Sequence, residues 1–123
     1  MKNQNILLAG SIFMALAVLL GAFGAHALKN SMTPEMLAVY KTGVEYQFYH
    51  ALGLLLIGSL GFHIESKWVG RSGLFLALGI LLFSGSLYAL SLTGIKMIGA
   101  ITPIGGVSFV LGWIFLARAF MKH

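Results

Sequence analysis

Four long apolar stretches constrain this chain more than any other feature of its sequence. They cover about residues 6–28, 44–62, 72–92 and 98–117, and only short polar segments separate them. An α-helix rises about 1.5 Å per residue, so each stretch can cross a hydrocarbon core about 30 Å thick. Backbone polar groups in lipid must be bonded internally, and these stretches lack the alternation of barrel strands. We therefore expect an all-α, antiparallel bundle of four transmembrane helices forming a single domain, residues 1–123.

The composition agrees with a membrane protein. The chain has 123 residues, of which 59% are hydrophobic and only 9% are charged. A soluble domain of this size needs a larger polar fraction to cover its surface. The eight Lys and Arg residues are scattered singly, without the basic patch that nucleic-acid binding requires. The expected partner is the lipid bilayer, not nucleic acid.

The second apolar stretch is preceded by a segment that predicts a short helix of its own. Thr33 is a good N-cap residue, Pro34 suits the first helical position, and Glu35 favours the positive end of a helix. Residues 34–42 are too polar to cross a membrane, so we expect an amphipathic helix at the interface. Gly43 would permit a bend between this helix and the second span.

The first apolar stretch could be mistaken for a signal peptide. Ala25-His26-Ala27 has the small-x-small pattern of a cleavage site, and Lys2 precedes the apolar run. However, the hydrophobic region of a signal peptide has only about 7–15 residues, which is shorter than residues 6–28. We expect this segment to be retained as the first span.

The distribution of charge predicts the orientation. With four spans, both termini lie on the same side of the membrane. That side carries one acidic residue, Glu65, and five basic ones: Lys2, Lys67, Arg71, Arg118 and Lys122. The other side carries Lys29, Lys41 and Lys96 against Glu35 and Glu45. Because Lys and Arg are enriched in cytoplasmic loops, we expect both termini in the cytoplasm.

The polar residues within the spans converge on one half of the membrane. An antiparallel bundle brings together the end of the first span, the start of the second, the end of the third and the start of the fourth. The candidate polar site in this half comprises His26, Glu45, Tyr46, Tyr49, His50, Ser84, Ser86, Tyr88 and Thr102. Small residues permit close helix packing. The candidate packing residues are Gly21, Gly24, Gly85, Gly105 and Gly106.

His50 is the most informative member of this group. It lies several residues inside the second span, where an ionisable group is expected to face the protein interior or a water-filled cavity. Its expected partners are Glu45, Tyr88 and His26. A hydrogen bond to Tyr88 would indicate structural adhesion between helices, whereas a pair with Glu45 would indicate proton handling.

The sequence shows no catalytic or metal-binding constellation. There is no cysteine, no aspartate, no HExxH motif and no phosphate-binding loop. Only Glu45 and the histidines could perform acid/base chemistry. We predict no metal site, no cofactor and no enzymatic activity.

Four segments carry a resemblance to a known family. They are GAFGAHALK at 21–29, YQFYHALGLL at 46–55, LLFSGSLYALSLTG at 81–94 and GAITPIGG at 99–106. In this order and spacing the chain resembles domain of unknown function family 423, the YgdD-like small inner-membrane proteins, over nearly its whole length. The resemblance implies a multi-pass protein of the bacterial plasma membrane. It supplies no activity, because the family has no established biochemical function.

Two classes of function remain. The first is a non-enzymatic membrane protein that packs with itself, as a homo-oligomer, or with a membrane-protein partner. The second is a small oligomeric transporter or channel with a polar site near the non-cytoplasmic face. A water-accessible pocket around His50 would favour transport, and a dry, fully bonded His50 would favour the structural role.

Overall fold

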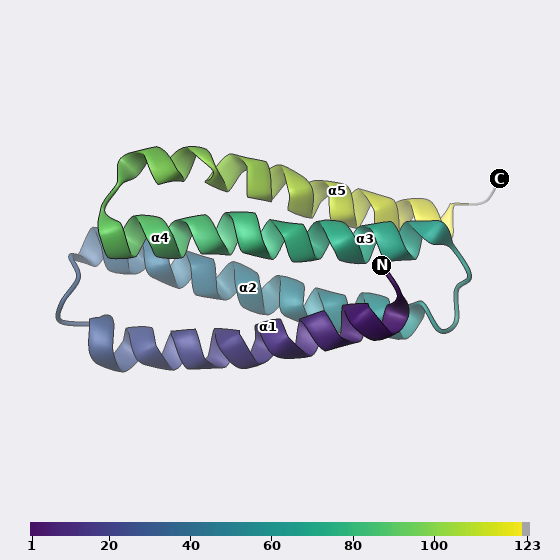
Figure 1. The fold of residues 1–123 in the computed structure, drawn as a ribbon, viewed down its shortest axis with the longest axis horizontal. Helices are drawn as coiled ribbons and strands as arrows, with labels where there is room; N and C mark the ends of the chain where they lie inside the picture. Colours follow the sequence, from purple (N-terminus) through teal and green to yellow (C-terminus); the bar gives the residue numbers. More distant parts are fainter. Residues whose placement is uncertain (122–123) are drawn as a thin grey trace.

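The computed structural model describes residues 1–121, which contain helices and no strands (Figure 1). Lys122, counted above among the basic residues, lies outside the described part of the chain. The helices are α1 (Asn3–Phe23), α2 (Pro34–Leu60), α3 (Lys67–Gly79), α4 (Gly85–Thr93) and α5 (Thr102–Phe120). Three short helical segments among the described residues are not α-helical. η1 (Gly24–Leu28) and η2 (Ile80–Ser84) are π-helices, and η3 (Lys96–Ala100) is a 3₁₀ helix. Because η1 prolongs α1 and η2 joins α3 to α4, the chain forms four long helical segments.

The four segments run antiparallel to their neighbours (Figure 1). α1 packs along α2, and α3 packs along α5. The two pairs meet where α2 lies against α3, η2 and α4. The α1–α2 and α4–α5 connections lie together at one end of the bundle, here called the connection end. The start of α1, the end of α5 and the α2–α3 connection lie at the opposite end, here called the terminal end (Figure 1).

Three of these segments are long and apolar enough to cross a membrane. They are Asn3–Leu28, Lys67–Thr93 and Lys96–Phe120. α2 has 27 residues, so its length suffices, but it is not among the three. It carries Glu45, Gln47 and His50 within its apolar part, and these side chains reduce its hydropathy.

The expected interfacial helix before the second span is not a separate element. α2 begins at Pro34 and continues unbroken through Gly43. The predicted cap is confirmed, because the Thr33 hydroxyl accepts a hydrogen bond from the Met36 N–H at 3.2 Å. Gly43 makes no bend because it serves close packing instead: a Cβ atom there would lie 2.9 Å from the Tyr88 ring. Tyr40, one turn earlier, is buried and ties this segment to the bundle.

The interior consists of two hydrophobic clusters. The larger reaches from the terminal end to the middle of the bundle and comprises Ile6, Leu54, Ile57, Val69, Leu76, Ala77, Ile80 and Phe109. The smaller lies at the connection end and comprises Leu28, Tyr40 and Val44, flanked by side chains that include Leu20 and Tyr88. α2 contributes to both clusters and is therefore the central helix of the fold.

The candidate packing glycines differ in how tightly they are enclosed. A Cβ atom at Gly105 would lie 2.7 Å from the Phe83 Cα, and one at Gly24 would overlap the Tyr40 ring. Cβ atoms at Gly21 and Gly106 would make ordinary contacts, at 3.4 and 3.8 Å. At Gly85 nothing lies within 4 Å. Of these five candidates, Gly24 and Gly105 therefore lie where neighbouring segments approach too closely for a side chain.

Candidate functional site

The structure places the predicted polar residues on the segments expected, but it does not gather them into one site. His26 on η1 is exposed, as are Glu45, Tyr46 and Tyr49 on the outer faces of α2. His50 is buried, with 7% of its surface exposed. His26, Glu45 and Tyr49 therefore lie on the outside of the bundle, and His50 faces the interior as predicted. Tyr46 is only partly exposed, because its ring stacks with His50 at a centroid distance of 6.1 Å and lies 4.7 Å from the Phe83 ring.

His50 contacts none of its three expected partners. Its Nδ1–H donates a hydrogen bond to the Tyr46 carbonyl of its own helix, at 2.8 Å. Its ring stacks on Phe109 of α5, with the centroids 3.6 Å apart and the planes at 11°. Trp113 lies on a second side, with its ring centroid 5.9 Å away. A carbonyl oxygen can only accept, so the Nδ1 atom carries the proton, and the imidazole acts mainly as an aromatic packing surface between α2 and α5.

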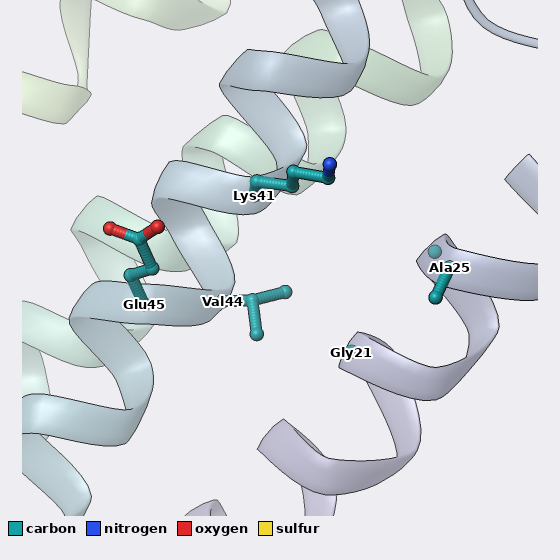
Figure 2. A pocket seen from close by; sticks show the side chains of 6 residues that line it. Gly21, Ala25, Lys41, Val44 and Glu45 are labelled. Atoms are coloured by element: carbon teal, nitrogen blue, oxygen red, sulfur yellow. The ribbon is translucent and has the colours of Figure 1, made fainter. Parts of the chain in front are cut away.

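Glu45 lies beside a shallow cleft between α1 and α2 (Figure 2). The cleft has a volume of about 180 Å³, and Gly21 of α1 and Ala25 of η1 form one wall. Val44 points toward this wall, whereas the Glu45 carboxylate points away from it (Figure 2). Lys41 lies one turn earlier on the same helix and also borders the cleft. Glu45 is thus a rim residue and is not directed at His50.

The residue that links the helices is Gln47, which sequence reasoning did not include in the site. Its Nε2 donates to the Phe13 carbonyl of α1 at 2.7 Å, and its Oε1 accepts from the Tyr88 hydroxyl of α4 at 2.6 Å. Only 2% of its surface is exposed. One buried amide therefore joins three helices.

A signal for Gln47 was present in the sequence. The buried residues of α2 include Tyr40, Gly43, Gln47, His50 and Leu54. They recur at intervals of three and four, the period of one helix face. Glu45, Tyr46 and Tyr49 fall outside this period. The helical period therefore distinguishes the buried amide of Gln47 from the exposed side chains of Glu45, Tyr46 and Tyr49, whereas chemical type alone does not.

Three further hydrogen bonds join neighbouring segments near the connection end. The Ser84 hydroxyl donates to the Gly43 carbonyl at 2.6 Å. The hydroxyls of Ser86 and Thr102 bond to each other at 2.6 Å, connecting α4 to the start of α5. Tyr40 donates to the Leu20 carbonyl of α1 at 2.5 Å. Ser84, Ser86, Tyr88 and Thr102 are therefore all occupied in contacts between segments.

A second cleft lies between α1 and the junction of η2 and α4. Its volume is about 210 Å³, and its walls are mainly apolar side chains such as Leu16 and Leu81. Gln47 and Tyr88, whose polar atoms bond to each other, also line it, together with Gly85. Within residues 1–121, no group of three His, Cys, Asp or Glu side chains could hold a metal ion. The two clefts that border the predicted polar residues are thus small and mainly apolar. A larger cleft of about 400 Å³ lies between the α1–α2 and α4–α5 connections, where Met32 and Leu92 line it.

Comparison with protein-family models matches residues 20–106 to the family described as "Protein of unknown function (DUF423)". The UPF0382 membrane protein YwdK of Bacillus subtilis is 46% identical over 118 residues, which cover 95% of this chain and 96% of the relative. The UPF0382 inner membrane protein YgdD of Escherichia coli is 40% identical over 116 residues, covering 94% of this chain and 88% of the relative.

A UPF0382 membrane protein of Staphylococcus saprophyticus is 48% identical over 118 residues, covering 94% of this chain and 96% of the relative. No solved structure matches the chain. The family model covers well over half of the sequence, and the relatives match along nearly their whole length. The chain therefore belongs to the DUF423 family of membrane proteins of unknown function, as the predicted resemblance indicated.

Proposed function

We propose that this protein is a four-span, non-enzymatic protein of the bacterial plasma membrane, which acts by packing with itself or with another membrane protein. The observation that carries this proposal is the use of the buried polar groups. Gln47, Ser84, Ser86, Tyr88 and Thr102 all bond to neighbouring segments or to each other. Polar groups that bond in this way stabilise a helix bundle. Few buried polar side chains therefore remain available to bind a substrate.

The position of α2 supports a fourth span. Its 27 residues correspond to about 40 Å of helix, and about 30 Å suffices to cross the hydrocarbon core. It packs along α1 and against α3, η2 and α4, all of which belong to candidate spans. Gln47 and His50, which lower its hydropathy, are buried against protein and not against lipid. Contacts with three candidate spans therefore support a position of α2 within the membrane.

The dispersal of the ionisable groups argues against an enzyme. His26 and Glu45 are exposed, and His50 is covered by the Phe109 ring. General acid/base catalysis needs such groups within hydrogen-bond reach of one substrate atom. The outer surface is rich in exposed apolar side chains on α1 and α5, and it is the part of the molecule through which the protein would pack with a partner.

Membrane topology is the first test, and the chain suits it because it contains no cysteine. We would introduce one cysteine at a time, as Ser31→Cys, His63→Cys or Lys96→Cys, and label spheroplasts with a membrane-impermeant maleimide. With both termini in the cytoplasm, positions 31 and 96 label in intact spheroplasts, and position 63 labels only after lysis. Labelling of positions 31 and 63 from the same side would show that α2 does not span.

Native mass spectrometry in mild detergent tests the proposed mode of action. We expect a homo-oligomer or a retained membrane-protein partner. A monomer with no bound protein, obtained under conditions that preserve a known membrane dimer, would contradict the proposal.

A small oligomeric transporter or channel is the second candidate, favoured by the cleft that Gln47 and Tyr88 line. Gly85 borders this cleft, and a Cβ atom there would meet nothing within 4 Å. Gly85→Leu should therefore fill the cleft without disturbing the fold. If the variant abolishes a cellular phenotype at normal abundance, transport or ligand binding at the cleft is the better function; an unchanged phenotype favours the non-enzymatic packing role.

A further inference from the structure

Three cationic side chains surround one tryptophan ring at the terminal end. The Arg71 Cζ atom lies 4.7 Å from the Trp68 ring centroid, the Arg118 Cζ atom 5.5 Å and the Lys67 Nζ atom 5.7 Å. Lys67 and Arg71 belong to α3, whereas Arg118 comes from α5. Two helices therefore concentrate positive charge around the same ring.

The ring is held in place by its neighbours. Trp68 packs against Phe115 of α5 with the centroids 5.5 Å apart, and Phe115 meets Phe75 edge to face at 5.0 Å. The backbone N–H of Trp68 donates to the Ser66 hydroxyl at 3.2 Å, which caps the start of α3 and fixes the backbone that carries the ring. The cations are thus arranged around a fixed aromatic platform.

Few acidic side chains are available to balance the charge of this cluster. The chain has three acidic residues, and two of them, Glu35 and Glu45, lie on the first half of α2, toward the connection end. Glu65 alone belongs to the terminal end. Cation–π contacts at exposed sites contribute about 0.5–1 kcal/mol each, but they leave the net positive charge in place. An anion from outside the chain would offset the repulsion among the three cations.

The geometry points to the phosphate of an anionic phospholipid, such as phosphatidylglycerol, as this anion. Arginine forks match phosphate oxygens, and tryptophan is favoured at the level of lipid headgroups. Basic pockets between transmembrane helices on the cytoplasmic side bind such headgroups. The start of α3 adds the positive end of a helix dipole at the same place. This inference rests on the proposed placement of the terminal end at the membrane surface.

Tryptophan fluorescence can test the inference directly, because the chain has only two tryptophans. Trp113→Phe leaves Trp68 as the single reporter. We would reconstitute this variant in nanodiscs containing phosphatidylglycerol and phosphatidylcholine, with one of the two brominated near the top of its acyl chains. Preferential quenching by brominated phosphatidylglycerol is expected.

Two charge-removing variants make the test specific. Arg71→Gln/Arg118→Gln removes two cations from the cluster, and each cation near an anionic surface contributes about fivefold to lipid binding, so the preference should fall about 25-fold. Lys29→Gln/Lys96→Gln removes the same charge at the connection end and should leave the preference unchanged. Circular dichroism checks that both variants remain folded. An equal loss in both variants would overturn the inference, because it would reflect net charge only.

The remaining outcomes separate the inference from the proposed function. Equal quenching by both lipids would overturn lipid recognition while leaving the membrane placement intact. Absence of quenching by either lipid would show that Trp68 is not at the membrane, and both proposals would then fail. A large excess of inorganic phosphate should not reduce the preference; if it does, the site binds free phosphate and the lipid assignment is wrong.

Discussion

Toward the terminal end of the bundle the helices meet mainly through aliphatic side chains packed on glycines, with one hydrogen bond between helices, from the Ser108 hydroxyl to the Phe75 carbonyl at 2.7 Å. Ile6 packs against the position of Gly73, and Leu76 packs against that of Gly112. Toward the connection end, several hydrogen bonds between helices add to the glycine contacts. There Gln47 bonds to α1 and α4, and Ser84 bonds to α2. The same bundle therefore uses two means of cohesion.

The difference follows from the lipid environment. Apolar side chains gain little by leaving lipid for protein, so shape complementarity must hold the terminal end. Polar side chains in a membrane need partners, and pairing them between helices satisfies the need and adds adhesion. The free energy of unfolding should therefore depend mainly on side-chain volume at the terminal end and on individual hydrogen-bonding atoms at the connection end.

The largest effect is expected from filling the terminal end. A Cβ atom at Gly112 would already lie 2.7 Å from the Leu76 Cδ2 and 3.2 Å from the Ser72 carbonyl oxygen. Gly112→Leu should lower the free energy of unfolding by about 3 kcal/mol, at the upper end of overpacking costs, or prevent folding. SDS titration from mild detergent, followed by circular dichroism, measures this. Gly85→Leu is the matched control, because a Cβ atom there meets nothing within 4 Å and leucine favours a helix more than glycine does. An equal loss there would show that lack of space at Gly112 does not decide the result.

The next effect concerns Gln47. Gln47→Leu removes the bonds to the Phe13 carbonyl and the Tyr88 hydroxyl, and hydrogen bonds between membrane helices contribute about 0.6 kcal/mol on average and about 1.7 at most. The free energy of unfolding should fall by about 1–3 kcal/mol in the same SDS titration. A more stable Gln47→Leu protein would mean that the amide is retained for a function other than cohesion.

The smallest effects distinguish two buried serines. Ser84 donates to the Gly43 carbonyl, whereas the Ser72 hydroxyl is buried without a partner among the described residues. Ser84→Ala should cost about 0.6 kcal/mol, and Ser72→Ala should be neutral or slightly stabilising, because no bond is lost. Parallel SDS titrations of the two variants provide the measurement. If Ser72→Ala is more destabilising than Ser84→Ala, the proposed difference between the two ends is wrong.

Substitutions of His50 and Glu45 test whether the polar residues have a structural or a functional role. His50→Leu removes the bond to the Tyr46 carbonyl and the ring stacking on Phe109, but it keeps an apolar side chain between α2 and α5, so the effect on stability should be small. Glu45→Gln changes an exposed side chain. If the polar residues are structural, any phenotype of either variant should follow protein abundance, measured by immunoblotting. A lost phenotype at wild-type abundance would assign a functional role to these residues.

The helical architecture could be predicted because long apolar runs and short polar connections specify it locally. The cap at Thr33 was equally local and is confirmed. The separate interfacial helix was wrong because burial of Tyr40 and the contact of Gly43 with Tyr88 keep α2 continuous, and both depend on helices distant in sequence.

The candidate site was predicted less well than the fold. Chemical type led to Glu45 as a partner for His50, but helical period places Glu45 on the outside and Gln47 on the inside. The stacking of His50 on Phe109 could not be predicted, because it depends on how α5 is placed beside α2 and no local signal specifies that.

The central claim is that the buried polar residues join the helices, and the Gln47–Tyr88 bond tests it most directly. A double-mutant cycle of Gln47→Leu, Tyr88→Phe and the combined variant in the SDS titration isolates the energy of this pair. The account predicts a favourable coupling of about 0.6–1.7 kcal/mol, the range of hydrogen bonds between membrane helices. A coupling indistinguishable from zero, with both single variants folded and fully stable, would contradict it.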